Sequence, residues 1–387
     1  MAFDFDTVYD RRHMLSVKYD VVPEDVLPLW VADMDFKTAP AITKALDNFI
    51  KQGIYGYAKI PNAYYEAIKN WHLRREGIIF EKEWILPIPG IVPAISATLG
   101  ALTLPGDQVI IQSPVYNCFF SSIRNQGLET IDNQLILDDK HCYHMDLEDL
   151  KIKLQHPRAR VLLLCNPQNP GSRLWTYAEL AELVAICKEK NIIVISDEIH
   201  CDLRANGSEF TSLAKFTSEL KDRLVIFRSA SKAFNLAGLQ NAYIICKDSY
   251  LRERIDRQIN INEVCDLNPL GIIATIAALN EGQNWLEELN DYIEGNYRYL
   301  KEFLEKNCPQ IKLTPLNATY LAWLDIKGLN LSSKKFCHKL LAEGKVLLSC
   351  GEEYGAGGDG FVRLNLACPQ TTLKQALYRI LKIVSDL

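Results

Sequence analysis

The amino-acid sequence predicts an α/β protein in which a mostly parallel sheet lies between helices, followed by a smaller α+β domain. Short apolar runs alternate with helical patterns through the middle of the chain. Such alternation is typical of parallel strands that are buried on both faces. Polar residues directly follow several of these runs, and open sheets bind ligands beyond the carboxyl ends of their strands. We expect a large domain over residues 49–284 and a small domain formed by residues 1–48 and 285–387.

The composition supports two domains and argues against several classes of protein. The chain has 387 residues, of which 48% are hydrophobic, enough for two substantial cores. Its net charge of −5 argues against a nucleic-acid or acidic-membrane partner. The acidic start lacks the apolar region of a signal peptide, and no apolar run approaches the roughly 20 residues of a membrane span. We therefore expect a cytoplasmic protein.

The cysteines and histidines do not predict a metal site. Eleven cysteines are scattered, none forms a CxxC pair, and most lie in apolar runs, as reduced core cysteines do. His141, Cys142 and His144 cluster in a polar segment without a second pair of ligands nearby. We expect a solvated loop there.

The first helices and strands are predicted between residues 41 and 112. The strand at 84–90 ends in Gly90, and the next helical pattern starts at Ile91. The amides at a helix N-terminus are free and the helix dipole is positive there, so this junction can bind a phosphate. The other elements of this part are predicted at 41–52, 62–76, 91–102 and 109–112.

Three apolar strands follow, at residues 161–165, 192–195 and 224–227. Between the first two, Thr176 and Glu179 form a capping box that opens a helix ending near Lys190. Right-handed crossovers place the ends of parallel strands along one sheet edge, so the residues just beyond them can face one crevice. These residues are an amide, a carboxylate and an amine: Asn169, Asp197 and Lys232.

The last part of the chain predicts mixed helices and strands, with one long helix leading out of the large domain. The glycine run at 355–360 matches GxGxxG literally. No strand precedes it and a strand follows it, so the context of a dinucleotide site is missing and we expect a mobile loop. The elements are predicted at 242–246, 271–279, 285–306, 319–326, 332–343, 361–366 and from 372 to the end.

The residues expected at the crevice suit pyridoxal 5′-phosphate. Its aldehyde needs a lysine amine for a Schiff base, and its pyridine nitrogen needs a buried carboxylate. Its phosphate needs amides and hydroxyls, its phenolic oxygen needs a donor, and its ring needs an apolar or aromatic cover. Lys232, Asp197 and Asn169 provide three of these groups. The alternative for Lys232 is an ordinary lysine at the start of a surface helix.

Three motifs around these residues resemble the class I/II aminotransferase-like enzymes of fold type I. They are Asn-Pro-x-Asn-Pro at 166–170, Ser-Asp-Glu-Ile-His at 196–200 and Ser-x-Ser-Lys-x-Phe-Asn at 229–235. The segment Leu-Trp-Val-Ala-Asp-Met-Asp-Phe at 29–36 is similar to one branch, the bacterial cystathionine β-lyases and cysteine C–S lyases, which includes the maltose-regulon modulator. The resemblance implies the fold-type I architecture, the cofactor pyridoxal 5′-phosphate bound by the large domain, and a homodimer with shared active sites.

The resemblance also implies a role for each residue around the cofactor. Lys232 forms the Schiff base and moves the Cα proton, and Asp197 pairs with the pyridine nitrogen. Asn169 donates to the phenolic oxygen, near His200. Tyr116 stacks on the ring and completes the catalytic set. The phosphate is implied to contact Ser229, the amides of Ile91 and Val92, and Tyr57 from the neighbouring subunit.

The substrate is implied to be held by Arg363, which grips its α-carboxylate, with Asn169 nearby. Each role has a structural alternative. Asp197 can cap a helix, Arg363 can form a surface ion pair, and His200 and the tyrosines can be ordinary core residues. Asp33 and Asp35 are further candidates for the site.

Two positions depart from the family pattern. Many aminotransferases have a phosphate-binding arginine eight residues after the lysine, where this chain has Gln240. The favoured branch often lacks that arginine too, so the departure argues against an ordinary aminotransferase. In addition, the common Asn-Pro-x-Gly turn reads Asn169-Pro170-Gly171-Ser172 here.

The expected reaction is a β-elimination on an S-substituted cysteine, such as cystathionine, giving a thiol, pyruvate and ammonia. Lys232 is expected to remove the Cα proton, and burial and nearby positive charge are expected to lower its pKa. An aminotransferase that uses the same residues is the first alternative. A regulatory protein that acts through a protein partner is the second.

Overall fold

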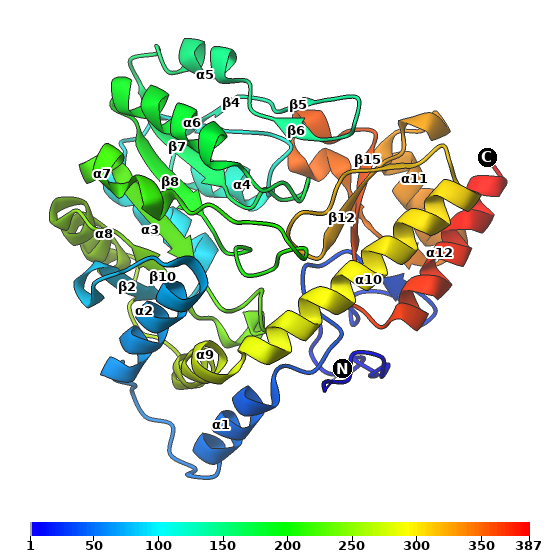
Figure 1. Cartoon of the computed structure of the whole chain (residues 1–387), viewed down its shortest axis with the longest axis horizontal. Coiled ribbons are helices and arrows are strands. Elements are labelled where there is room, and N and C mark those ends of the chain that lie inside the picture. Colours follow the sequence, from blue (N-terminus) through cyan, green and yellow to red (C-terminus); the bar gives the residue numbers. More distant parts are fainter. Residues whose placement is uncertain (1) are drawn as a thin grey trace.

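A computed structural model describes residues 2–387 of the chain (Figure 1). Its largest feature is a seven-stranded sheet whose first and last strands in sheet order are β2 and β4. Five neighbouring strands are parallel, whereas β10 is antiparallel to the strands on both its sides. The predicted α/β class with a mostly parallel sheet is therefore confirmed. The sheet order is β2 (Ile85–Ile88), β10 (Ala242–Ile245), β9 (Leu224–Arg228), β8 (Ile193–Asp197), β7 (Ala159–Cys165), β3 (Gln108–Ile111) and β4 (Glu129–Asp132).

The central strands are apolar throughout because they separate two cores. In β7, Leu162 and Leu164 pack into one core, whereas Val161 and Leu163 pack into the other. Continuous apolar runs are what strands buried on both faces require. Helices that contribute to the first core include α2 (Asn62–Glu76), α6 (Tyr177–Glu189) and α9 (Pro269–Glu281). Those of the second core are α3 (Ile91–Leu102), α4 (Cys118–Asn125) and α8 (Ser249–Ile261).

Most predicted helices agree with the structure to within a few residues. The capping box of α6 is present, since the Thr176 hydroxyl accepts from the Glu179 amide and the Glu179 carboxylate accepts from the Thr176 amide. Helix α8 was not predicted. Its buried residues Leu251, Ile255 and Ile259 recur every four positions, a helical signal that polar neighbours obscure.

The smaller domain is built on an antiparallel four-stranded sheet. The long helix α10 (Gln283–Asn307) connects it to the large sheet and packs against α12 (Gln370–Ser385), as Figure 1 shows. The predicted division into a large domain with a mostly parallel sheet and a smaller domain is thus confirmed. Its strands in sheet order are β11 (Lys312–Leu313), β12 (Leu321–Asp325), β15 (Phe361–Asn365) and β14 (Ser349–Cys350).

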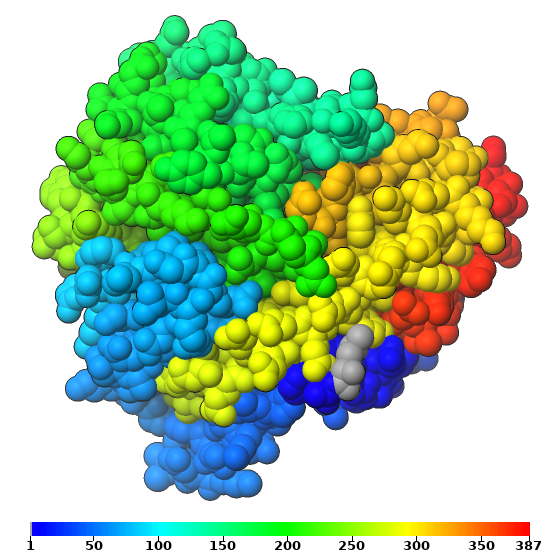
Figure 2. All heavy atoms as spheres, viewed as in Figure 1, coloured from blue at the N-terminus to red at the C-terminus, as the bar shows by residue number. Residues whose placement is uncertain are grey.

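The N-terminal segment joins the smaller domain through backbone pairing. Strand β1 (Leu27–Pro28) is parallel to β13 (Val346–Leu347). In the space-filling view the dark-blue first residues lie beside α10 (Figure 2), where Glu288 accepts from the amides of Ala2 and Phe3. Helix α1 (Pro40–Ile50) instead packs against α9. The domain limits 1–48, 49–284 and 285–387 stay a prediction.

The remaining elements are short or lie at the edges of the molecule. No helix within residues 2–387 combines the length and the apolar character needed to cross a membrane. The remaining helices and strands are β5 (Ile136–Leu137), β6 (Tyr143–His144), α5 (Leu147–Lys153), α7 (Thr217–Leu220) and α11 (Ser333–Lys339).

Two loops can be compared with their predictions. The glycine run was expected to be mobile, but it is tightly packed: Gly355 lies against Phe120, and the backbones of Gly351 and Gly358 are in contact. Among residues 2–387 no group of three or more His, Cys, Asp or Glu side chains is arranged to hold a metal ion. Within the histidine–cysteine cluster, His144 contacts the Asp138 carboxylate at 2.9 Å.

Candidate active site

One cavity of about 720 Å³ lies beyond the carboxyl ends of β7, β8 and β9. Asn169, Asp197 and Lys232 line it together, as their positions after three parallel strands predict. Arg363 enters it from β15 of the smaller domain. The site therefore lies between the two sheets, and both domains contribute to it.

Lys232 follows β9 in an irregular turn and not at the start of a helix, so the surface-helix alternative is wrong. Its Nζ atom donates a hydrogen bond to the carbonyl oxygen of Ala32 at 2.7 Å. Burial, together with the positive charge of Arg363, lowers the Lys232 pKa to about 8, although Asp33 and Asp197 oppose this shift. A substantial fraction of the amine is thus neutral near physiological pH, as a base or nucleophile requires.

Asp197 is the last residue of β8 and is only 3% exposed. Its Oδ1 accepts from the Ile199 amide at 3.1 Å, and no cation within residues 2–387 forms an ion pair with it. Burial raises its pKa to about 7. A buried carboxylate that faces a cavity without a positive partner is suited to a cationic group of a ligand.

Three nitrogen atoms of residues that line the cavity are buried without a hydrogen-bond partner in the described part of the chain: Nδ1 of His200, Nδ2 of Asn241 and Nε of Arg363. An unsatisfied buried donor or acceptor costs about 1–3 kcal/mol, so these atoms indicate that a ligand supplies the missing partners. The other Arg363 nitrogens are engaged, Nη1 with Asn169 Oδ1 at 3.2 Å and Nη2 with the Trp30 carbonyl at 2.9 Å. The buried arginine is therefore held in place and is not in a surface ion pair.

The N-terminus of α3, the predicted anion site, lies at the cavity. Ile91 and Val92 line the cavity there. Ser229 does not line it, because its hydroxyl donates to the Asn241 carbonyl at 2.6 Å and accepts from the Ser231 amide at 3.0 Å. The cavity is lined instead by Ser231, which the Ser-x-Ser pattern contained but which was not selected.

The tyrosines have different positions. Tyr116 lines the cavity, and its burial raises its pKa. Tyr57 is fully exposed in an apolar turn with Ile54 and Tyr55, outside the cavity of its own chain. Its predicted contact with a neighbouring subunit stays a prediction.

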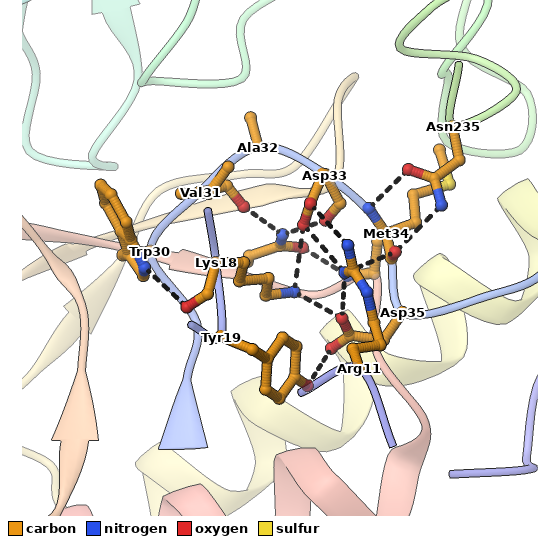
Figure 3. Close-up of polar contacts among 12 residues, drawn as sticks. Arg11, Lys18, Tyr19, Trp30, Val31, Ala32, Asp33, Met34, Asp35 and Asn235 are labelled. Atoms are coloured by element: carbon orange, nitrogen blue, oxygen red, sulfur yellow. Dashed lines mark hydrogen bonds and ion pairs between the residues drawn. The ribbon is translucent and has the colours of Figure 1, made fainter. Parts of the chain in front are cut away.

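A backbone strap over residues 30–36 lines one side of the cavity through Trp30, Val31 and Ala32. Figure 3 shows the polar contacts that hold this strap. Asn235, three positions after Lys232, bonds to the amide and carbonyl of Met34. Asn365, two positions after Arg363, donates to the carbonyls of Val31 and Asp33, both at 2.6 Å. The strap therefore links the lysine turn to the arginine strand.

A buried ion cluster supports the strap from its other side (Figure 3). Asp35 accepts from Arg11 at 2.7 Å, from Lys18 at 3.0 Å and from the Tyr19 hydroxyl at 3.0 Å. Asp33 pairs with Arg11 at 2.9 Å. The two aspartates, which were candidates for the site, are therefore committed to structure, and their basic partners were not predicted.

Comparison with known proteins identifies the family. The chain matches the family described as aminotransferase class I and II over residues 24–380. The chain belongs to this family. It is 38% identical to cystathionine β-lyase PatB of Bacillus subtilis over 97% of this chain and 98% of that protein. It is 28% identical to protein MalY of Escherichia coli over 99% of both chains.

A solved structure of this aminotransferase class I and II family extends the comparison. Cystalysin from Treponema denticola, described as containing pyridoxal 5′-phosphate, superposes with a TM-score of 0.97 at 32% identity over 100% of both chains. The chain thus lies in the cystathionine β-lyase and C–S lyase branch that includes MalY, as its motifs predict. The family uses pyridoxal 5′-phosphate, which agrees with the predicted cofactor.

The residues of this family member fit the cofactor. Asp197 offers an unpaired buried carboxylate, Lys232 a partly neutral amine, and His200 an unsatisfied ring nitrogen. The free amides of α3 and the Ser231 hydroxyl suit a phosphate. Gln240 also lines the cavity, at the position where many aminotransferases have an arginine.

Proposed function

We propose that this protein is a pyridoxal 5′-phosphate-dependent C–S lyase that performs β-elimination on S-substituted cysteines. The products are a thiol, pyruvate and ammonia. The observation that carries the proposal is the 38% identity to a cystathionine β-lyase over nearly the whole chain. A cavity that combines a partly neutral lysine with a buried arginine supports an amino-acid substrate.

The cofactor would be held by groups from both sides of the cavity. When bound, pyridoxal 5′-phosphate supplies an aldehyde and an electron-accepting ring. Lys232 would hold the aldehyde carbon, Asp197 the pyridine nitrogen, and Asn169 the phenolic oxygen, with His200 beside it. Tyr116 would cover the ring. Ile91, Val92 and Ser231 would hold the phosphate, whereas Ser229 would support this turn from behind.

The substrate would be oriented through its α-carboxylate. The guanidinium of Arg363 is stacked on Tyr354, with Cζ 5.0 Å from the ring centroid, and its Nε is free. A planar guanidinium can hold a carboxylate at two points. Asn169, which contacts Arg363 at 3.2 Å, would assist this orientation.

Once the substrate amine has replaced it at the cofactor aldehyde, Lys232 would act on the Cα proton. Its neutral amine accepts that proton, and the Ala32 carbonyl, 2.7 Å away, can hold the resulting ammonium. The electron pair of the broken C–H bond passes toward Cβ, and the sulfur leaves with the electrons of the C–S bond. Arg363 and the strap keep Cα near Lys232 during this transfer, which is the main contribution of a positioned base.

We further propose a cytoplasmic homodimer in which Tyr57 reaches the phosphate at the site of the neighbouring subunit. The exposure of Tyr57 together with Ile54 and Tyr55 supports a contact surface there. Apolar side chains that are exposed next to one another favour burial in an interface.

The deciding experiment incubates the purified yellow protein with L-cystathionine and no keto acid. We expect pyruvate, ammonia and a thiol in equal amounts. An aminotransferase would instead require an added keto acid and release no pyruvate from cystathionine, and that outcome would refute the lyase.

A regulatory function is the second candidate. The N-terminal segment exposes five apolar side chains outside the cavity, which suits a protein partner. Cofactor binding without elimination or amino transfer would favour this function. The five residues are Val8, Met14, Leu15, Val17 and Val21.

A further inference from the structure

Among the residues that line the cavity, four carry a formal charge: Lys232, Arg363, Asp197 and Glu353. Under the proposed function, the first three meet the cofactor aldehyde, the substrate α-carboxylate and the pyridine nitrogen. Glu353 has no such task. Its carboxylate also forms no ion pair and no side-chain hydrogen bond within residues 2–387.

The backbone around Glu353 is fixed. It lies in the 3₁₀ turn Gly351–Tyr354. The carbonyl of Tyr354 accepts from the Val115 amide at 2.8 Å, and the Tyr354 ring lies under the Arg363 guanidinium. A Cβ atom on Gly351 would lie 2.0 Å from the Gly358 carbonyl oxygen, so the turn is closed by direct backbone contact. The carboxylate is thus presented by a packed loop next to the substrate arginine.

Glu353 is an exposed residue that lines the cavity near Arg363. Partial burial raises its pKa, and the positive charge of Arg363 acts in the opposite direction. The nitrogens Nη1 and Nη2 of Arg363 are engaged with Asn169 and Trp30, so Glu353 is not the partner of this arginine.

The proposed reaction fixes a substrate by its α-amine and its α-carboxylate, which leaves the group on sulfur to extend through the rest of the 720 Å³ cavity. An unpaired carboxylate on the wall attracts an ammonium group and repels a second carboxylate. We propose that Glu353 selects S-substituted cysteines whose sulfur substituent carries an ammonium group. This inference rests on the proposed lyase function and narrows its substrate class. Cystathionine carries this ammonium group on its homocysteine half beside a carboxylate that Glu353 repels, so we expect it to gain less than a substituent with the ammonium alone.

The test compares three substrates of similar length that differ in charge at the end of the substituent. They are S-(2-aminoethyl)-L-cysteine, S-propyl-L-cysteine and S-(2-carboxyethyl)-L-cysteine. Pyruvate release gives kcat/KM for each. In the unmodified protein we expect kcat/KM of the aminoethyl substrate to exceed that of the propyl substrate by about twofold to fivefold, as an exposed charge pair allows.

The variant Glu353→Gln keeps the size of the side chain and removes its charge. We expect the ratio of kcat/KM for the aminoethyl substrate to that for the propyl substrate to fall to about one. We expect kcat/KM of the carboxyethyl substrate to rise relative to that of the propyl substrate. Glu352→Gln is the matched control, because Glu352 is also exposed and is adjacent in sequence but does not line the cavity. It should leave the ratio unchanged.

Two results would overturn the role of Glu353: a ratio that Glu353→Gln does not alter, or an equal change caused by Glu352→Gln. Absence of pyruvate from all three substrates would overturn the lyase function instead. In that event, binding replaces turnover as the readout. The dissociation constants of the same three compounds are measured from the cofactor absorbance, and the aminoethyl-to-propyl preference is calculated from them. A ratio insensitive to Glu353→Gln there also rejects the inference.

Discussion

The Nζ atom of Lys232 lies 2.7 Å from the carbonyl oxygen of Ala32, two hundred positions earlier in the chain. The Tyr320 hydroxyl donates to the same oxygen at 2.8 Å. The amine that is proposed to hold the cofactor and move a proton is therefore positioned by the backbone of the strap. This contact links the chemistry of Lys232 to the ion cluster behind the strap.

Replacing Lys232 by alanine should remove both the attachment of the cofactor and the base. We expect no near-visible absorbance band without added amine, and a fall in kcat of about 10²–10⁴. Absorbance spectra and pyruvate release measure the two effects. The exposed Lys215→Ala is the control and should keep the band. If Lys232→Ala keeps the band, another lysine holds the cofactor.

Asp197 should make the stability of the cofactor-free protein depend on pH. Its pKa in the folded protein is about 7, above the ordinary 3.8. The folded state therefore binds more protons than the unfolded state between these values, and stability falls as pH rises from about 4 to about 7. The variant Asp197→Asn has no carboxyl to titrate at this position, so its stability should not fall with pH for this reason.

Urea unfolding of the cofactor-free protein and of Asp197→Asn at several pH values measures this dependence. The protein should lose about 2–4 kcal/mol relative to the variant across the window. The exposed Asp139→Asn should follow the unmodified protein. Parallel curves for the protein and Asp197→Asn would contradict the raised pKa.

Arg363→Lys should weaken recognition of the α-carboxylate, because an ammonium cannot form the two-point contact of a guanidinium. We expect kcat/KM to fall by about tenfold to a hundredfold, mainly through KM. The comparison substrate is the corresponding S-substituted cysteamine, which has no α-carboxylate. An equal loss with both compounds would show that Arg363 does not act on that group.

Asp35→Asn should destabilise the protein, because it leaves Lys18, which is fully buried, with an incomplete partner. Breaking a buried pair costs about 3–5 kcal/mol. The double variant Asp35→Asn with Lys18→Met should lose less free energy of unfolding than the two single variants lose together. Guanidinium unfolding measures all of them, and the exposed Asp25→Asn should be nearly neutral. Additive losses would mean that the two residues do not interact.

The shared site can be tested by mixing two weakened variants. If Tyr57 acts on the neighbouring site, a hybrid of Tyr57→Ala and Lys232→Ala subunits contains one intact site. Co-expression should then restore on the order of a quarter of full activity, since half of the dimers are hybrids. Activity that stays at the mean of the two variants would place Tyr57 at its own site or outside any site.

Much of the fold could be predicted because its signals are local. The apolar runs of β7, β8 and β9, and the capping box of α6, depend on neighbouring residues. The rule that parallel strands end at one sheet edge then brings Asn169, Asp197 and Lys232 to one cavity. Helix α8 was missed because only one narrow face of it is apolar.

The details of the site depend on contacts between distant residues. Ser229 and Ser231 are two positions apart, and only the bond from Ser229 to Asn241 determines which hydroxyl faces the cavity. Glu353 was not considered, because nothing in its sequence neighbourhood separates it from Glu352. The packed turn places Glu353 at the cavity wall.

By itself, the sequence determined the fold class, the family and the residues that meet at the crevice, because apolar periodicity and motif spacing are properties of short stretches. Only the tertiary structure decided that Asp33 and Asp35 pair with Arg11 and Lys18, and that the Ala32 carbonyl faces Lys232. Burial and long-range pairing set these roles, since a charge or carbonyl has its effect only through the groups that the fold places beside it.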